Sequence, residues 1–140
     1  MNPNDSIELV LRFWRELWNP PYNFAVIDEI LSEDFAFASA GTEIVTRAAF
    51  KEWVTKHKSV FHNGRFYVLD TLANSDGTRV VGRWKTTGTN NGMFGLPPDG
   101  QAVEFTGISI MQIRGDRIVH QWAERSALEC YQKLSGMDRP

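Results

Sequence analysis

The hydrophobic pattern of the chain changes its period once, near residue 64. Before that point, apolar residues recur every three or four positions, as they do on one face of an α-helix. After it they alternate with polar residues, as in strands that bury one face. The pattern therefore predicts helices in the first half of the chain, followed by a series of antiparallel strands.

The first two helices are predicted from apolar spacing and from end signals. Asp5 followed by Glu8 has the pattern of a capping box, and the first helix stops before Pro20, since proline interrupts helices. Its apolar stripe consists of Ile7, Val10, Leu11, Trp14, Leu17 and Trp18. A second, shorter helix is expected over about residues 24–31, and a short apolar strand over residues 35–39.

A third helix is predicted to begin after Thr46, which caps it, and to end near Asn63-Gly64. Its apolar face has helical spacing and consists of Phe50, Trp53, Val54, His57 and Phe61. One histidine therefore lies on a stripe of otherwise apolar side chains.

Four strands are predicted after the third helix. They cover residues 66–72, 78–89, 103–113 and 117–125, and a polar tail follows them. A hairpin turn at residues 74–77 joins the first two strands, since Asn and Gly favour such turns. A long loop rich in Gly and Pro, residues 90–101, separates the second strand from the third.

These elements predict a single α+β domain over residues 1–140. We expect the domain to be cone-shaped, with a curved antiparallel or mixed sheet and three N-terminal helices that enclose an apolar pocket. The strand at 103–113 is apolar on both faces. Phe105, Met111 and Ile113 lie on one face, and Ile108 and Ile110 on the other. A face wetted by solvent would not have this composition, so we expect a second subunit to cover it in a homodimer.

Composition narrows the class of partner. A formal net charge of −2 without any run of Lys or Arg argues against nucleic acid and against an anionic membrane. Cys130 is the one cysteine, so no internal disulfide forms, and no signal peptide or membrane span is evident. We therefore expect a cytoplasmic protein. Five Trp and nine Phe suit an apolar core and also a pocket for flat ligands.

Residues 83–107, RWKTTGTNNGMFGLPPDGQAVEFTG, resemble the signature of the SnoaL-like polyketide cyclases in the nuclear-transport-factor-2-like superfamily. That family has an R-W strand, a G-T-H-x-G turn, a G-L-P-P-x-G loop and a V-E-F-T-G strand. The resemblance extends over about residues 8–130. It implies a cone-shaped fold and a cofactor-independent acid–base enzyme. Characterised members typically close a ring of a polycyclic substrate by an aldol step, using an Asp in the last strand and nearby histidines.

Three positions differ from the family pattern. Residues 36–38 read Ala-Phe-Ala where the family often has a His, Asn90 replaces the His of the G-T-H turn, and Ser126 aligns with the last-strand Asp. None of these side chains titrates usefully near neutral pH. The replacements argue against an aldol cyclase that works through the family's usual residues.

Glu124 is the first candidate for a substitute acid–base group. Alternation along a strand places His120, Trp122, Glu124 and Ser126 on one face. If that face lines the pocket, Glu124 lies against aromatic rings, which would raise its pKa toward neutrality. The alternative is that a bulge near the strand end turns Glu124 toward solvent.

His57 and His120 are the other candidate catalytic residues. His57, on the apolar stripe, would serve as a pocket base or donor, unless it is a core histidine held by a backbone carbonyl or by Tyr67. His120 shares the face of Trp122 but lies closer to a turn. No pair of His, Cys, Asp or Glu has metal-ligand spacing, so no metal is expected.

Eight residues are candidates for binding the substrate: Trp14, Phe37, Trp53, Trp84, Asn90, Phe94, Trp122 and Ser126. Core packing explains the aromatic members equally well. Phe94 lies in the long loop, where it would form an apolar lip over the pocket mouth or only shape a surface turn.

The leading hypothesis is a cyclase, isomerase, dehydratase or hydrolase that needs no cofactor and acts on a small apolar, cyclic metabolite. The alternatives are a non-catalytic ligand-binding or dimerisation module that has lost the family's catalytic residues, and an accessory subunit that docks on a larger enzyme. The fold alone cannot choose among them.

Overall fold

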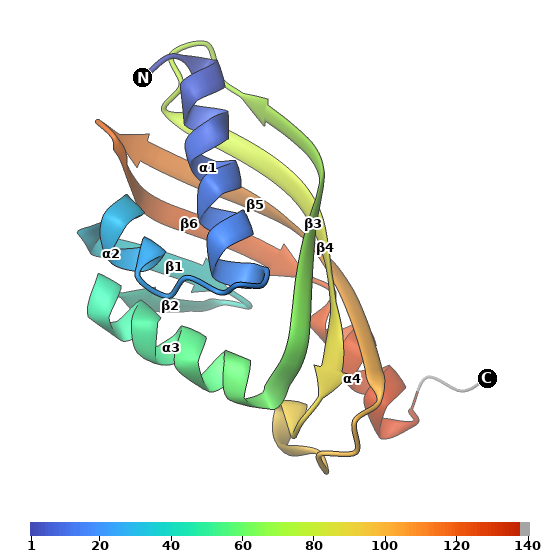
Figure 1. The fold of residues 1–140 in the computed structure, drawn as a ribbon. Coiled ribbons are helices and arrows are strands. Elements are labelled where there is room, and N and C mark those ends of the chain that lie inside the picture. Colours follow the sequence, from blue (N-terminus) through green and yellow to red (C-terminus); the bar gives the residue numbers. More distant parts are fainter. Residues whose placement is uncertain (138–140) are drawn as a thin grey trace.

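The computed structural model describes residues 1–137, and these residues form four α-helices, one short 3-10 helix and six strands (Figure 1). The helices are α1 (Pro3–Trp18), α2 (Val26–Ile30), α3 (Arg47–Val60), η1 (Met93–Gly95) and α4 (Ala127–Ser135). The strands are β1 (Leu31–Ser39), β2 (Thr42–Val45), β3 (Phe61–Ala73), β4 (Arg79–Asn90), β5 (Ala102–Arg114) and β6 (Arg117–Arg125).

The strands form one mixed sheet in the order β2-β1-β6-β5-β4-β3. β1 runs parallel to β6, and every other neighbouring pair is antiparallel. Figure 1 shows the sheet strongly curved, with α1, α2 and α3 along its concave side. The expected α+β architecture is therefore confirmed, and the space between these helices and the sheet is where a pocket can form.

Two glycines in the middle of the sheet allow indole rings to approach its concave face closely. A Cβ atom at Gly82 would lie 2.5 Å from the ring of Trp14, and one at Gly107 would overlap the ring of Trp84. Any larger residue would push these rings away from the strands. The glycines thus bring a tryptophan of α1 and a tryptophan of β4 into the same cavity wall.

The helix ends agree only partly with the sequence pattern. The predicted cap of the third helix is confirmed, because Thr46 Oγ1 accepts a hydrogen bond from Ala49 N at 3.1 Å. The prediction of a capping box at Asp5 is wrong, since Asn2 caps α1 by accepting a hydrogen bond from Asp5 N. Pro3 occupies the first turn of the helix. Pro suits that position because its missing N–H is not needed there.

Three other differences concern the end of one helix and two elements that were not predicted. The third helix ends at Val60 rather than near Gly64, because the chain already pairs as β3 from Phe61 onward. Residues 42–45 form an edge strand that the pattern did not predict. Residues 127–135, expected to be a polar tail, form α4, which packs against β5.

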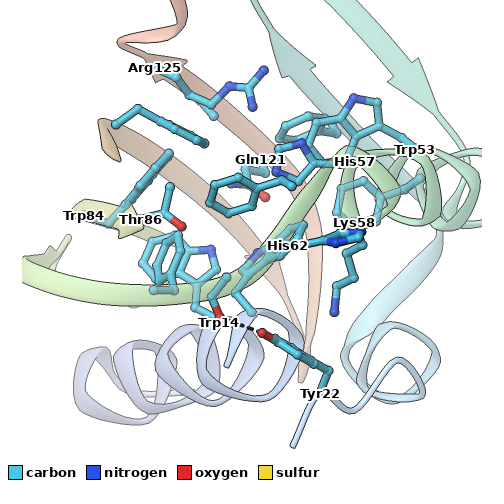
Figure 2. Close-up of a pocket in the computed structure, with 18 of the residues that line it drawn as sticks. Trp14, Tyr22, Trp53, His57, Lys58, His62, Trp84, Thr86, Gln121 and Arg125 are labelled. Atoms are coloured by element: carbon cyan, nitrogen blue, oxygen red, sulfur yellow. Dashed lines mark hydrogen bonds between the residues drawn. The ribbon is translucent and has the colours of Figure 1, made fainter. Parts of the chain in front are cut away.

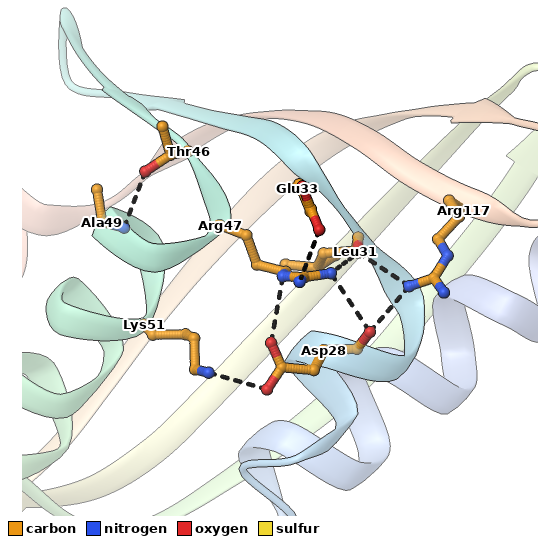
Figure 3. A network of polar contacts seen from close by, with 8 residues as sticks. All are labelled: Asp28, Leu31, Glu33, Thr46, Arg47, Ala49, Lys51 and Arg117. Carbon is orange, nitrogen blue, oxygen red and sulfur yellow. Dashed lines mark hydrogen bonds and ion pairs between the residues drawn. The ribbon is translucent and has the colours of Figure 1, made fainter.

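Asp28, in the middle of α2, holds three elements together (Figure 3). Its carboxylate pairs with Arg47 at 3.2 Å and with Lys51 at 2.8 Å, both on α3. Arg117 of β6 donates to the backbone carbonyls of Asp28 and Leu31. Although each exposed pair contributes little stability alone, the network fixes the position of α3 over the sheet.

A row of apolar side chains crosses three neighbouring strands on the convex face of the sheet. Val81, Ile110 and Trp122 are paired across β4, β5 and β6, so their side chains share that face. Ile108 and Ile110 are 51% and 37% exposed. None of the helices in residues 1–137 is long and apolar enough to cross a membrane.

Candidate functional site

A cavity of about 300 Å³ lies between α1, α3 and the concave face of the sheet (Figure 2). Its walls are mainly aromatic, and the rings are those of Trp14, Trp18, Tyr22, Phe37, Phe50, Trp53, Phe61, Phe66, Trp84 and Phe105. The predicted apolar pocket is therefore present. Such a cavity suits a small, flat, apolar ligand.

The predicted wall residues divide into two groups. Trp14, Phe37, Trp53 and Trp84 line this cavity. The prediction for Trp122 is wrong, since that side chain lies on the convex face, where the Arg79 guanidinium covers its ring at 4.8 Å.

Asn90, Phe94 and Ser126 also lie outside the cavity lining. Asn90 is buried and holds the β4–β5 loop, accepting hydrogen bonds from Gly92 N and Met93 N. Ser126 precedes α4, and its Oγ accepts a hydrogen bond from Thr106 N. Phe94 packs edge-on against Tyr131 and lines a second cavity instead.

The expected orientation of Glu124 and His120 is wrong. Ala123 pairs with the buried Ser109 of β5, so odd-numbered residues near the end of β6 face the cavity. Glu124 is exposed on the opposite face, and His120 stacks on Trp122 there at 3.9 Å. The error came from aligning the face on Ser126, which lies beyond the end of the strand.

His57 does reach the cavity, from the inner face of α3. Its ring stacks on Trp53, with centroids 5.1 Å apart and planes 5° apart, and it meets the edge of Trp18 at 5.6 Å. Among residues 1–137, no group forms a hydrogen bond with its ring nitrogens. Neither a backbone carbonyl nor Tyr67 holds the ring as in the core-histidine alternative.

Burial lowers the pKa of His57 to about 4, and the positive charges of Arg125 and Lys58 act in the same direction. Removing water disfavours the charged imidazolium, as do nearby cations. His57 is therefore neutral at neutral pH, with one ring nitrogen able to accept a proton or a hydrogen bond.

Gln121 and Arg125 are the β6 side chains that sequence analysis missed. Gln121 donates from its amide to Ser109 Oγ at 3.1 Å, and the same oxygen accepts a hydrogen bond from Trp84 Nε1 at 3.0 Å. Arg125 extends from the end of β6 toward α3 (Figure 2). The strand pattern contained the signal, because either alternate set of β6 residues could have been chosen as the inner face.

Arg125 is a half-buried cation without an anionic partner among residues 1–137. Its guanidinium carbon lies 5.7 Å from the ring centre of Trp53 and 5.9 Å from that of Phe105. Its Nε is buried and has no hydrogen-bond partner in the described part of the chain. Burial lowers the pKa of Arg125. No Asp or Glu lines the cavity within residues 1–137.

A second cavity, of about 390 Å³, adjoins the first and is bordered by the loop around η1. The two cavities share Trp53, His57, Phe105 and Arg125 in their walls. His57 and Arg125 therefore lie at the junction of the two spaces.

Tyr22 and Lys58 lie at the mouth of the first cavity. Tyr22 donates a hydrogen bond to the Gly64 carbonyl at 2.8 Å, which links the α1–α2 connection to β3. Lys58 Nζ donates to the Leu17 carbonyl at 2.6 Å and lies 4.3 Å from the centre of the Tyr22 ring. Burial lowers the pKa of Lys58 to about 8.

The described residues contain no cluster of three or more His, Cys, Asp or Glu side chains that could hold a metal ion. The polar side chains that line the cavity are those of Tyr22, His57, Lys58, His62, Asn63, Thr86, Gln121 and Arg125. They can exchange protons, donate hydrogen bonds and attract an anion.

The chain is similar to known proteins both in sequence and in fold. The sequence model described as SnoaL-like polyketide cyclase matches residues 8–134. No curated protein sequence matches this chain significantly.

Three solved structures show the likeness in fold. A candidate SnoaL-like polyketide cyclase from Jannaschia sp. CCS1 superposes with a TM-score of 0.86 at 18% identity, over 99% of this chain and 95% of that one. AclR, a candidate hydroxylase from Streptomyces galilaeus, superposes with a TM-score of 0.84 at 20% identity, over 99% of this chain and 85% of AclR. An epoxide hydrolase from M. tuberculosis, described as LEH-like, superposes with a TM-score of 0.73 at 14% identity, over 95% of this chain and 86% of the hydrolase. At such identities the likeness shows the fold alone.

Proposed function

This chain belongs to the SnoaL-like polyketide cyclase family, and from that premise we propose that it is a cofactor-independent enzyme that transfers protons on a small apolar, cyclic compound. The observation that carries the proposal is the state of His57. A neutral imidazole without a protein partner borders an aromatic cavity, where a bound ring compound would exclude water.

His57 is the acid–base group in this proposal, in place of Glu124 and His120. A neutral imidazole nitrogen takes a proton from carbon next to a substrate carbonyl, and the bond electrons move onto the carbonyl oxygen as an enolate. Return of the proton to the same or another carbon completes an isomerisation. For a cyclisation, the enolate carbon attacks a second carbonyl to form the ring bond, and the resulting alkoxide takes the proton back from the imidazolium. Dehydration and hydrolysis begin with comparable proton transfers.

The family fold does not choose among these reactions. The structures that this chain resembles carry descriptions as different as polyketide cyclase, hydroxylase and epoxide hydrolase. A shared fold supports a shared cavity, whereas the reaction depends on the side chains in it. The proposal therefore rests on His57 and on the aromatic walls of the cavity.

A binding module without catalysis is the second candidate. It is favoured by the absence of any carboxylate from the cavity lining within residues 1–137. It is favoured also by Asn90 and Ser126, which occupy family acid–base positions and instead hold a loop and a helix start.

Deuterium exchange distinguishes the two candidates. The probe is 2-tetralone, an apolar bicyclic ketone, and NMR in D₂O follows the loss of its protons next to the carbonyl. We expect the wild-type protein to accelerate exchange over buffer and His57→Gln to remove most of the acceleration. His62→Gln is the matched control, because His62 is an exposed histidine at the same mouth, 3.2 Å from Asn91. If the ketone binds but its exchange is not accelerated, the binding module is the better description.

The proposal also includes a homodimer that forms through the convex face of the sheet. The apolar row formed by Val81, Ile110 and Trp122, in which Ile110 is exposed and the other two are half-buried, supports it, because apolar strips on a protein surface mark interaction sites. In that arrangement each cavity stays on the concave side, away from the interface.

A further inference from the structure

Proton transfer by His57 leaves Arg125 without a role, although Arg125 lies at the centre of the site. We infer that the ligand is a flat apolar ring compound bearing a carboxylate, and that Arg125 is the residue that pairs with this carboxylate. The inference names the substrate class of the proposed enzyme and so rests on that proposal. It can nevertheless be tested by binding alone.

The environment of Arg125 differs from that of the other arginines. Arg12, Arg47 and Arg114 each pair with a carboxylate. Arg117 donates to backbone carbonyls. The remaining arginines of the described residues are exposed, so water can solvate them: Arg15, Arg65, Arg79 and Arg83. Arg125 alone in residues 1–137 combines a buried, unpaired Nε with a position on a cavity wall.

Stacking on aromatic rings does not satisfy the hydrogen-bond donors of Arg125. Trp53 and Phe105 lie within 6 Å of its guanidinium carbon and attract the cation. The five N–H donors, however, lie in the plane of the guanidinium group and point away from its faces. A buried Nε–H without an acceptor is costly, so a bound acceptor at this place completes the site.

A carboxylate fits the donors better than other anions do. Its two oxygens match the planar guanidinium fork in a paired, two-bond contact. Lys58, the other cation of the lining, already donates to the Leu17 carbonyl and lies over Tyr22. One unpaired guanidinium therefore balances one negative charge, whereas a phosphate carries more charge and needs more donors.

The shape of the cavity indicates the structure of the rest of the ligand. The first cavity is walled by flat rings, including the parallel pair of Trp53 and His57. Since Arg125 and His57 border both cavities, a carboxylate on Arg125 places the ring system in the aromatic cavity. The second cavity leaves room for a substituent. The atom that exchanges its proton with His57 then lies near the carboxylate-bearing end of the ligand.

Calorimetric titration with a matched pair of probes tests the inference. The probes are 2-naphthoate and 2-naphthamide, which share the ring system and differ in charge. We expect the wild-type protein to bind the naphthoate at least about tenfold more tightly than the amide. Arg125→Gln should abolish that preference, with the larger loss of affinity for the naphthoate. Arg83→Gln, at an exposed position on the convex face, is the control and should keep the preference.

Arg125→Lys serves as the second variant if Arg125→Gln does not fold. It keeps the charge but loses the two-bond contact, so it should retain part of the preference. Equal affinity of wild type for both probes, no binding of either at millimolar concentration, or a preference that survives in Arg125→Gln overturns the inference. A protein that binds naphthoate through Arg125 but does not accelerate exchange in 2-tetralone contradicts the proposed enzyme and leaves the carboxylate site standing.

Discussion

The imidazole of His57 lies parallel to the indole of Trp53, with ring centroids 5.1 Å apart and an angle of 5° between the planes. The two residues are four positions apart on α3, so the helix itself places one ring beside the other. Trp18 of α1 meets the imidazole edge-on from another side. This aromatic enclosure excludes water from the ring and keeps it neutral.

The stability of the protein should fall in mild acid because of His57. Its pKa is about 4 in the folded protein and ordinarily about 6.5, so the unfolded chain binds the proton more readily. The contribution of the neutral ring is present in full above the ordinary pKa and is lost as the pH falls toward 4. At pH 5 the loss amounts to about 2 kcal/mol in the free energy of unfolding.

Urea unfolding at pH 7 and pH 5 measures this effect. His57→Phe keeps the stack on Trp53 and cannot be protonated, so its midpoint should change less between the two pH values than that of wild type. His62→Gln changes an exposed histidine and should keep the wild-type pH dependence. A His57→Phe curve that shifts as much as the wild-type curve contradicts the prediction.

Gly82→Ala should distort the cavity wall. The added Cβ would lie 2.5 Å from the indole of Trp14, which must then move. We expect a loss of about 1 to 3 kcal/mol in the free energy of unfolding, as for other overpacked cores. Trp14→Phe has a smaller ring, so adding Gly82→Ala to that variant should cost less. Denaturant titration of the four proteins gives the coupling, and additive losses contradict the contact.

Lys58 should react with acylating reagents at unusually low pH. Burial lowers its pKa to about 8, whereas an ordinary lysine has a pKa near 10.4. At pH 8 about half of the Lys58 amines are therefore uncharged and nucleophilic. Mass spectrometry after brief treatment with acetic anhydride should show acetylation of Lys58 ahead of the exposed Lys56. Bound 2-naphthoate should protect Lys58 if it closes the mouth. Equal labelling of both lysines counts against the lowered pKa.

The sequence was most informative where one local signal determined the structure. The alternation of apolar and polar residues predicted a strand at β4, and Thr46 identified the start of α3. The hairpin at residues 74–77 joins β3 and β4 as predicted. In each case, short-range chemistry or a single period was sufficient.

Sequence analysis failed where a choice depended on distant contacts. Alternation along β6 has two possible inner faces, and pairing of Ala123 with the buried Ser109 decides between them. That pairing depends on β5, which a pattern within β6 cannot reveal. The same limit explains why Arg125 was missed: its burial results from Trp53 and Phe105, which lie far away in sequence.

The convex face of the sheet should form the homodimer interface. Ile110 lies in the middle of that face, between Val81 and Trp122, and is 37% exposed in a single chain. Ile110→Glu would bury a charge against apolar side chains in a dimer, which is strongly unfavourable. Light scattering at micromolar concentration should give twice the mass of the chain for wild type and the mass of one chain for the variant.

Leu128→Glu provides the control for this experiment, since Leu128 is an exposed apolar residue on α4, outside the sheet. We expect this variant to remain dimeric. A wild-type protein that is monomeric at micromolar concentration rejects the homodimer outright. If instead Ile110→Glu remains dimeric, the chains associate through another surface, and the apolar row needs a different explanation.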